Sequence, residues 1–438
     1  MTEILLITFA LVCFGLLGWG MRQKGRCYEF PFLAGGTFTS FVLPQLIGLR
    51  HNANLPPGGL DKTIIMSSLC AAMCYCGYRW RNRPWQSFSW QFNQRKLITA
   101  SAVLGVIGAY FFFAISRLPE EVREISTWSG LPVAYLFFAQ ILSYGFALAL
   151  LLFATTRSKL ALAIGMCAAV FYLDRIFLAG RRGVALEFMF VILLCFWFGR
   201  RLALPRGVML AALVIGTLAL HSTGDYRAAA NNREDSRWDL IKNIAFLENL
   251  ERQFNQGGAE MENAVYTIAA VDENSQFDYG AFHWNTLVFN YVPAQLFGPE
   301  FKNSLTLPLA EVDTYMMYGH TPSPGSTFSG MVDAFGSFGY FGCLKFFLIG
   351  FILRRLYSAA MAGHLVPQLL YMLIITDALH AITHHTQWFV SPWVHISLFL
   401  FPALYLARRA RASEPAWAPV PAAANPCVRA LTPAEIHS

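Results

Sequence analysis

Arginines gather where two apolar runs of the chain meet, at Arg175, Arg181 and Arg182. An arginine fork donates two parallel hydrogen bonds to phosphate oxygens, so these residues could hold a diphosphate group at the level of the lipid headgroups. Because Arg181 and Arg182 directly precede a predicted helix, its N-terminal dipole would add to any anion site there. The alternative is that these side chains reach lipid phosphates or pair with Asp174 and Glu187.

A second basic group follows the eighth apolar run, at Arg227, Arg233 and Arg237. Arg227 and Arg233 are candidates for the same diphosphate role, and Arg227 is the stronger one because it lies closest to the membrane plane. If this region is helical, Arg233 and Arg237 lie one turn apart, and acidic neighbours would make it a solvated, salt-bridged helix. Those neighbours are Asp225, Glu234, Asp235 and Asp239.

A candidate catalytic base lies in the segment Tyr318–Gly342, which is rich in glycine, serine and proline. His320 lies in a loop bounded by proline and glycine, and Asp333 follows at the entrance of the next apolar run. A neutral imidazole could remove a proton from an attacking sugar hydroxyl, and Asp333 could orient it or replace it. The alternative is a tightly turned structural loop in which the histidine has its hydrogen bonds satisfied.

Four histidines lie close together near the end of the apolar region: His380, His384, His385 and His395. An i, i+4 histidine pair can hold a metal, but membrane di-iron enzymes need several such motifs, and this chain has 10 histidines in all. We therefore expect interfacial polar residues, no metal site and no cofactor. Asp377 is costly at membrane depth and is a further site candidate.

Membrane helices must position these residues. Of the 438 residues, 55% are hydrophobic and 13% are charged, about half the charged share of soluble proteins. Crossing the hydrocarbon core takes roughly 17–25 apolar residues. We predict an all-α integral membrane protein with about eleven transmembrane helices. The runs are Ile4–Met21, Phe30–Leu49, Thr63–Tyr78, Leu97–Ile115, Leu131–Phe153, Leu160–Leu173, Val184–Phe198, Val208–Leu220, Gly339–Leu356, Val366–Ile382 and Pro392–Ala407.

The positions of lysine and arginine predict how the chain is oriented. Every odd-numbered connection between the runs is basic, from Arg22 and Lys24 after the first run to Arg354 and Arg355 after the ninth. The segment Ser222–Phe328 has six basic and fourteen acidic residues. Because basic connections stay on the cytoplasmic side, we predict an inner-membrane protein with a periplasmic N-terminus and a cytoplasmic C-terminus. The net charge of +7 is thus an orientation signal and not a nucleic-acid footprint.

The chain divides into four predicted parts. Residues 1–221 form the first eight transmembrane helices, 222–329 a large periplasmic loop, 330–409 the last three helices, and 410–438 a disordered cytoplasmic tail. Within the loop, apolar residues recur at helical spacing from Trp238 to Phe254, which predicts an amphipathic helix on the membrane surface or against the bundle.

Three stretches together resemble the bacterial O-antigen polymerase family, the oligosaccharide repeat-unit polymerases of envelope polysaccharide assembly. They are AGRRGVALEF at Ala179–Phe188, the long loop before the last helices, and GSTFSGMVDAFGSFGYFG at Gly325–Gly342. The segment Phe289–Leu305 is also similar to a proline- and lysine-containing stretch that precedes the final glycine-rich helix entrance of that family.

The resemblance implies a C-type glycosyltransferase-like fold that joins polyprenyl-diphosphate-linked oligosaccharide repeat units at the periplasmic face. It implies that Arg181 or Arg182, together with Arg227, stabilises the leaving diphosphate, and that His320 or Asp333 is the base. The carrier-linked oligosaccharide and the lipid bilayer are the expected partners, with a chain-length regulator and a flippase as the protein partners.

Two other functions stay open on the sequence alone. O-antigen ligases share the same plan, and their loop histidine, followed about ten residues later by glycine, is similar to His320 and Gly330. A ligase that transfers glycan from polyprenyl diphosphate to lipid A–core is therefore the alternative. A polyprenyl-linked saccharide flippase or transporter is the alternative of another class, although such folds commonly show paired halves, which this chain lacks.

Overall fold

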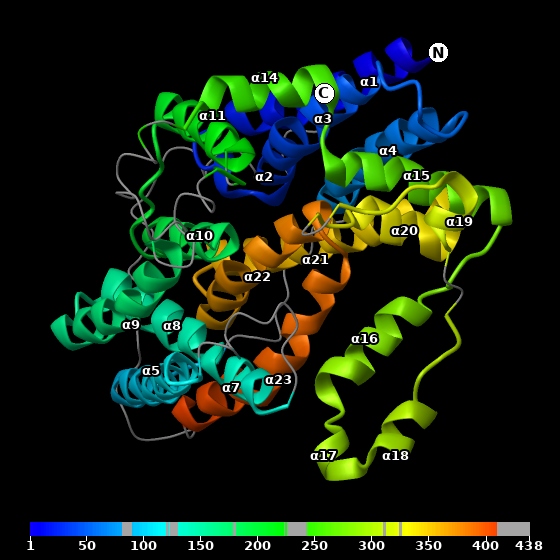
Figure 1. The fold of residues 1–438 in the computed structure, drawn as a ribbon. Helices are drawn as coiled ribbons and strands as arrows, with labels where there is room; N and C mark the ends of the chain where they lie inside the picture. The colour runs from blue at the N-terminus through cyan, green and yellow to red at the C-terminus, as the bar shows by residue number, and fades with distance from the viewer. Residues whose placement is uncertain are drawn as a thin grey trace, which may run out of the picture.

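The computed structural model shows a helical chain (Figure 1). It describes residues 1–80, 90–119, 122, 130–177, 181–222, 224–225, 242, 244–309, 312–323 and 326–409. Within these residues, 9 helices are long and apolar enough to cross a membrane. They are α1 (Thr2–Met21), α2–α3 (Phe30–Leu49), α5 (Gln94–Ser116), α7–α8 (Leu131–Thr156), α9 (Lys159–Phe177), α10 (Arg182–Arg200), α20–α21 (Gly330–Met361), α22 (Leu365–Thr383) and α23 (Gln387–Ala407).

Two of the eleven predicted runs form helices outside that set. α4 (Gly59–Arg79) has 21 residues, but Asp61, Lys62 and Arg79 reduce its apolar character. α11 (Arg206–His221) has 16 residues, about 24 Å at 1.5 Å per residue, against a hydrocarbon core of about 30 Å. The chain is therefore an all-α protein with multiple membrane-spanning helices.

α22 is the central helix of the bundle. The protein buries 89% of its most apolar window, compared with 17% for α5. In Figure 1, α22 lies between α10 on one side and α21 (Leu344–Met361) on the other, and it packs against both. On α5 the side chains of Val106, Tyr110 and Phe113 point outward and are exposed, as expected of a lipid-facing surface.

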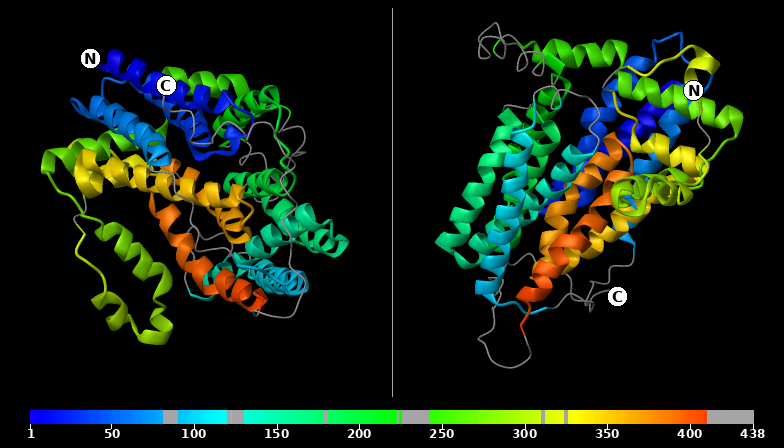
Figure 2. Two further views of the ribbon diagram at one scale, coloured as in Figure 1. Left: turned by 180° about the vertical axis from the view of Figure 1, so that it is seen from behind. Right: turned by 60° about the horizontal axis from the view of Figure 1, so that its bottom comes forward.

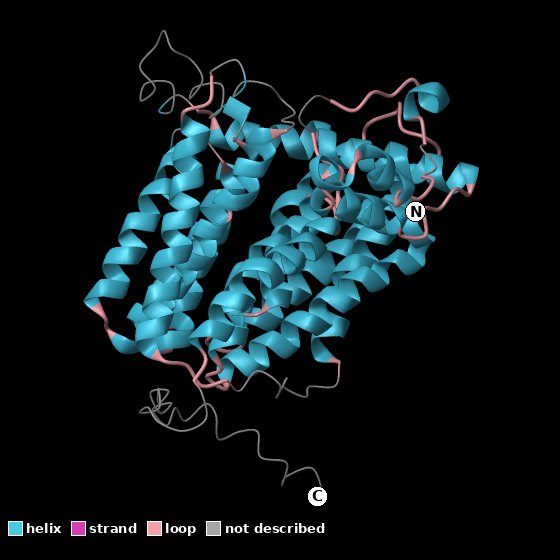
Figure 3. Cartoon of the chain, turned by 90° about the horizontal axis from the view of Figure 1, so that it is seen from below, coloured by secondary structure: helices cyan, strands magenta, loops and turns pink. Residues whose placement is uncertain are grey.

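The spanning helices run side by side between two faces of the molecule (Figure 3). At one face, hydrogen bonds join connections that the sequence predicts on the same side: Arg206 donates to the Arg22 carbonyl at 3.2 Å, and Arg201 donates to the Met361 carbonyl at 2.6 Å. The backbone amide of Asn93 donates to the carbonyl at the end of α23, 3.0 Å away. These contacts bring basic connections to a common face of the bundle.

The segment between α11 and α20 contains several helices besides the predicted one. α14 (Phe246–Gln256) corresponds to the end of the predicted amphipathic helix; it stops at Gly257 and packs against α3 (Leu43–Leu49) and α11. α15 (Ala259–Asn274), which the sequence did not predict, packs on α4 and α20 (Gly330–Phe338). The right-hand view of Figure 2 shows α14 and α15 at one end of the bundle.

A helical hairpin and a short helix complete this segment. They are α16 (Ala281–Tyr291), α17 (Ala294–Phe297), α18 (Pro299–Ser304) and α19 (Thr314–Tyr318). Residues 226–240, which include the start of the predicted amphipathic helix, and the predicted tail 410–438 lie outside the described residues.

Candidate functional site

The last turn of α22 is the place where the candidate residues come together. A Cβ atom added to Gly330, the first residue of α20, would lie 1.7 Å from the Ala381 carbonyl oxygen. One added to Gly183, at the start of α10, would lie 3.0 Å from the His380 ring. Gly330 lets the beginning of α20 approach the backbone of α22 more closely than a side chain would allow, and Gly183 leaves room for the His380 ring beside α10.

The connection between α9 and α10 carries its arginines to this end of the bundle. The backbone amide of Arg181 donates to the Arg175 carbonyl at 3.2 Å, which brings the two residues together across the connection. The Arg181 side chain is exposed, and α10 begins at Arg182. Arg227 and Arg233, the other predicted diphosphate ligands, lie outside the described residues.

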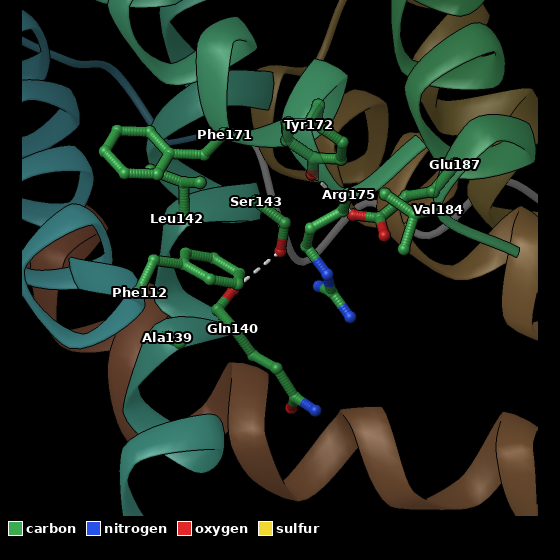
Figure 4. A pocket seen from close by; sticks show the side chains of 10 residues that line it. All are labelled: Phe112, Ala139, Gln140, Leu142, Ser143, Phe171, Tyr172, Arg175, Val184 and Glu187. Carbon is green, nitrogen blue, oxygen red and sulfur yellow. Dashed lines mark hydrogen bonds between the residues drawn. The ribbon is translucent and has the colours of Figure 1, made fainter. Parts of the chain in front are cut away.

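Arg175 lies beside a small cavity of about 50 Å³ among α5, α8, α9 and α10. Its guanidinium extends between Glu187 and Gln140 (Figure 4) and also stacks over the ring of Phe112, 5.2 Å from the ring centroid. Tyr172 donates a hydrogen bond to the Glu187 carboxylate at 2.7 Å. A space of about 50 Å³ has the size of a few water molecules. Of the predicted arginines with described side chains, Arg181 is thus the exposed one and Arg175 the partly buried one.

His320 is held in a defined orientation by α15. Its ring stacks on Tyr266 with a centroid distance of 3.9 Å and an interplanar angle of 7°. Its Nε2 lies 2.9 Å from Oδ1 of Asn263. Two neighbours on one face of α15 therefore fix the ring, although more than fifty residues of chain separate them from His320.

The hydrogen bonds around Asn263 decide the tautomer of His320. The Ser326 hydroxyl donates to the Ser323 carbonyl at 2.5 Å, because a carbonyl can only accept. Ser326 Oγ must therefore accept from the Asn263 amide nitrogen, 2.8 Å away, and this leaves Oδ1 of Asn263 facing His320. Nε2 of His320 then carries the proton, and Nδ1 keeps the lone pair.

Burial lowers the pKa of His320 below its ordinary value of 6.5. The ring is consequently neutral at neutral pH, with Nδ1 as the atom that can accept a proton. This is the protonation state that a general base requires.

Asp333, the other predicted base, is buried with its carboxylate already engaged. Oδ1 lies 3.3 Å from Lys345 Nζ and accepts the Thr386 hydroxyl proton at 2.9 Å. Oδ2 accepts from the backbone amide of Thr386. These bonds tie the α22–α23 connection to α20 and α21, so Asp333 serves to anchor that connection, and His320 is the better candidate for the base.

Two further histidines, His283 and His385, lie near Asp333. The sequence analysis had not singled out His283, because no motif or periodicity surrounds it. His283 of α16 contacts the Thr386 hydroxyl through Nε2 at 2.7 Å. His385 Nδ1 lies 3.9 Å from Asp333 Oδ2, and burial together with the charge of Lys345 lowers the pKa of His385 to about 4. Among the described groups, Nδ1 of each ring is buried without a hydrogen-bond partner.

The remaining histidines of the predicted group have structural partners. His395 receives a hydrogen bond from Tyr144 at Nδ1, 2.6 Å away, and donates through Nε2 to the Phe137 carbonyl at 2.9 Å. The rings of His380 and His384 pack against each other with centroids 5.4 Å apart. In the part of the chain that the structure describes, no three histidine, cysteine or acidic side chains are grouped to hold a metal ion.

The last turn of α22 also connects to the His320 loop. Thr327 donates to the Thr383 carbonyl at 2.9 Å, and its neighbour Ser326 contacts Asn263. A continuous set of contacts therefore runs from the α9–α10 connection, through the end of α22, to His320. Comparison with models of protein families, with curated proteins and with solved structures finds no match to this chain.

Proposed function

We propose that this chain is a membrane glycosyltransferase that joins oligosaccharide repeat units carried on polyprenyl diphosphate, with a C-type glycosyltransferase-like arrangement. The observation that carries the proposal is the pairing of two features at the end of α22. An exposed arginine, Arg181, lies on one side, and a neutral histidine with an open Nδ1, His320, lies on the other.

In the proposed reaction the acceptor sugar hydroxyl attacks the anomeric carbon of the donor chain. His320 Nδ1 takes the hydroxyl proton as the new C–O bond forms. The bond between the anomeric carbon and the diphosphate oxygen breaks, and polyprenyl diphosphate leaves with the electron pair. Arginine cations stabilise the charge that develops on that diphosphate, so the step as written uses no cofactor.

The orientation of the chain is part of the same proposal. The basic connections that meet at the face of Arg22, Arg201 and Arg206 would lie in the cytoplasm of a bacterial cell, following the bias of lysine and arginine. The end of α22, with His320 and the α9–α10 connection, would then face the periplasm from the inner membrane.

Replacing arginine by lysine tests the diphosphate role. Arg181→Lys keeps the charge but loses the planar fork, so we expect it to shorten the polymer nearly as much as Arg181→Ala does. Arg117, an exposed arginine at the end of α5 that stacks over Phe113, provides the matched control, and Arg117→Lys should leave polymer length unchanged. Full-length polymer from Arg181→Lys would reduce Arg181 to a structural or topological role.

The carrier-linked glycans that accumulate after deletion of the gene test the function as a whole. A polymerase predicts single repeat units on the carrier or on lipid A–core, with no long chains. Long chains left on the carrier would instead identify the ligase to which the spacing of His320 and Gly330 is similar. Repeat units confined to the cytoplasmic leaflet would identify a flippase, and an unchanged glycan profile would refute all three functions.

A further inference from the structure

The segment from Ala281 to Leu309 is unusually apolar for a stretch outside the spanning helices. Glu300 and Lys302 are its only two charged residues apart from a histidine. Large apolar side chains on it are nevertheless exposed. They are Trp284, Phe289, Leu296, Phe297, Phe301, Leu307 and Leu309, with Leu296 at 79% and Phe289 at 73% exposure.

The α16–α18 hairpin projects sideways from the bundle when the molecule is viewed roughly along the spanning helices (Figure 1). Its attachment is along the start of α23. The Tyr291 hydroxyl donates to the Ser391 carbonyl at 2.5 Å, and His283 contacts Thr386. Its two arms leave a cleft of about 310 Å³ between them, lined in part by Phe282 and Phe289. The arms therefore do not bury each other's apolar side chains.

Several polar groups of the hairpin form hydrogen bonds between its two arms. Trp284 Nε1 donates to the Leu305 carbonyl at 2.7 Å, and the Asn285 side chain bonds both the amide and the carbonyl of Leu307 at 2.8 Å. Lys302 donates to the Phe289 carbonyl at 2.8 Å. Protein interfaces typically carry about one hydrogen bond per 100–200 Å². Because these bonds already use Trp284, Asn285 and Lys302, the exposed apolar side chains between them fit acyl chains better than a protein partner.

The attachment point sets the depth of the hairpin relative to the spanning helices. Ser391 lies four residues after the first residue of α23, Gln387, which is about 6 Å along the axis at 1.5 Å per residue. Interfacial helices bury their apolar face about 5–10 Å into the boundary between headgroups and acyl chains. At the same end of α23, Trp388 is 46% exposed, as in the aromatic belts at membrane interfaces.

We propose that α16–α18 is an interfacial hairpin that inserts the side chains of Leu296, Phe297 and Phe301 into the lipid leaflet around the start of α23. The occupant of this surface is the bilayer itself, because the hairpin is attached at the start of α23, where Trp388 is also exposed. His283 of the hairpin contacts Thr386, and Thr386 in turn donates a hydrogen bond to Asp333. The hairpin is thus connected to the α22–α23 connection on one side and faces lipid on the other. The proposal stands independently of the proposed reaction.

Photocrosslinking of the full chain in lipid nanodiscs tests the proposal. A benzophenone amino acid replaces Phe297, and in a matched control it replaces Gln276, an exposed residue after α15. Lipid adducts identified by mass spectrometry should be at least about tenfold more abundant at Phe297, because its ring partitions into acyl chains while that of the control stays in water.

The identity of the adduct separates the possible outcomes. Lipid adducts at Phe297 that persist at high dilution of the protein support the interfacial hairpin. Adducts to a second copy of the chain, or a lipid yield at Phe297 equal to that at Gln276, overturn it. Because the readout is chemical, the result does not depend on any glycosyltransferase activity.

Discussion

Asn263→Asp should raise the pKa of His320, because the Asn263 oxygen faces the protonated Nε2. The substitution places a carboxylate where the amide oxygen now lies, 2.9 Å from Nε2. A negative charge at this position stabilises the imidazolium form. The pKa, which burial now holds below 6.5, therefore moves upward.

The size of the shift follows from Coulomb's law. Two unit charges about 4 Å apart interact by about 1 kcal/mol in water and about 4 kcal/mol at an effective dielectric constant of 20. His320 is half-buried, so screening brings the effect toward the lower end. At 1.36 kcal/mol per pKa unit, the expected rise is roughly 1–2 units.

Carbethoxylation of histidine measures this pKa without any substrate. The reagent attacks the neutral ring, so the modification rate of His320, followed by mass spectrometry from about pH 5 to 8, reports its titration. In the parent protein the midpoint should lie below 6.5, and in Asn263→Asp it should lie above the parent's. Asn263→Leu removes the hydrogen bond without adding charge, and its midpoint should not rise.

A midpoint that stays unchanged or falls in Asn263→Asp would refute the contact between His320 Nε2 and residue 263, because a carboxylate at that position stabilises the imidazolium whichever nitrogen carries the proton of the neutral ring. If His320 is also the base of the proposed reaction, the acidic limb of the polymerisation rate must move to higher pH by the same amount. A shifted midpoint with an unshifted rate profile would keep the contact with residue 263 and remove His320 from catalysis.

Three further predictions concern the end of α22. Gly330→Ala should destabilise the protein by about 3 kcal/mol or more, because the new methyl group meets a backbone carbonyl of α22. The control Gly336→Ala, which has open space around it, should leave the midpoint of unfolding in detergent unchanged. Equal midpoints for the two variants would show that α20 can move away from α22. Lys345→Met should lower the free energy of unfolding by about 3–5 kcal/mol, because it leaves the buried Asp333 carboxylate without its cation. Adding Asp333→Asn should recover part of this loss. Strictly additive losses in the double variant would mean that the two residues are not coupled. The pKa of His385 is lowered to about 4, so the stability that depends on its neutral ring is complete above about pH 6.5 and is lost as the pH falls toward 4, by roughly 1–3 kcal/mol. In His385→Phe the free energy of unfolding should therefore depend less steeply on pH over this range. An unchanged slope of that free energy against pH would contradict this.

The apolar runs of the sequence predicted the membrane helices well. Ten of the eleven runs lie within continuous helical segments, and the run Leu131–Phe153 covers α7 and α8 with Gln140 between them. The reason is that a backbone in lipid must satisfy its hydrogen bonds within its own segment, and a run of apolar residues can be recognised locally. The number of spanning helices was harder to predict than their positions, because α4 and α11 are helical but fall outside the 9 described helices that are long and apolar enough to cross a membrane. The amphipathic pattern before Gly257 indicated α14, but α15 was missed because it buries residues on more than one side and lacks a clean polar face.

The roles of the candidate residues depend on how the helices pack. The sequence predicted His320 as the base, with Asp333 to orient it or replace it. Packing of α15 and of the α22–α23 connection separated them, since Asn263 leaves one nitrogen of His320 open while Thr386 and Lys345 occupy the carboxylate of Asp333. Asn263 is separated from His320 by 57 positions in the chain, and Thr386 is separated from Asp333 by 53. Such pairings cannot be predicted from residue types and local spacing, because helix packing brings the atoms together and not their proximity in the chain.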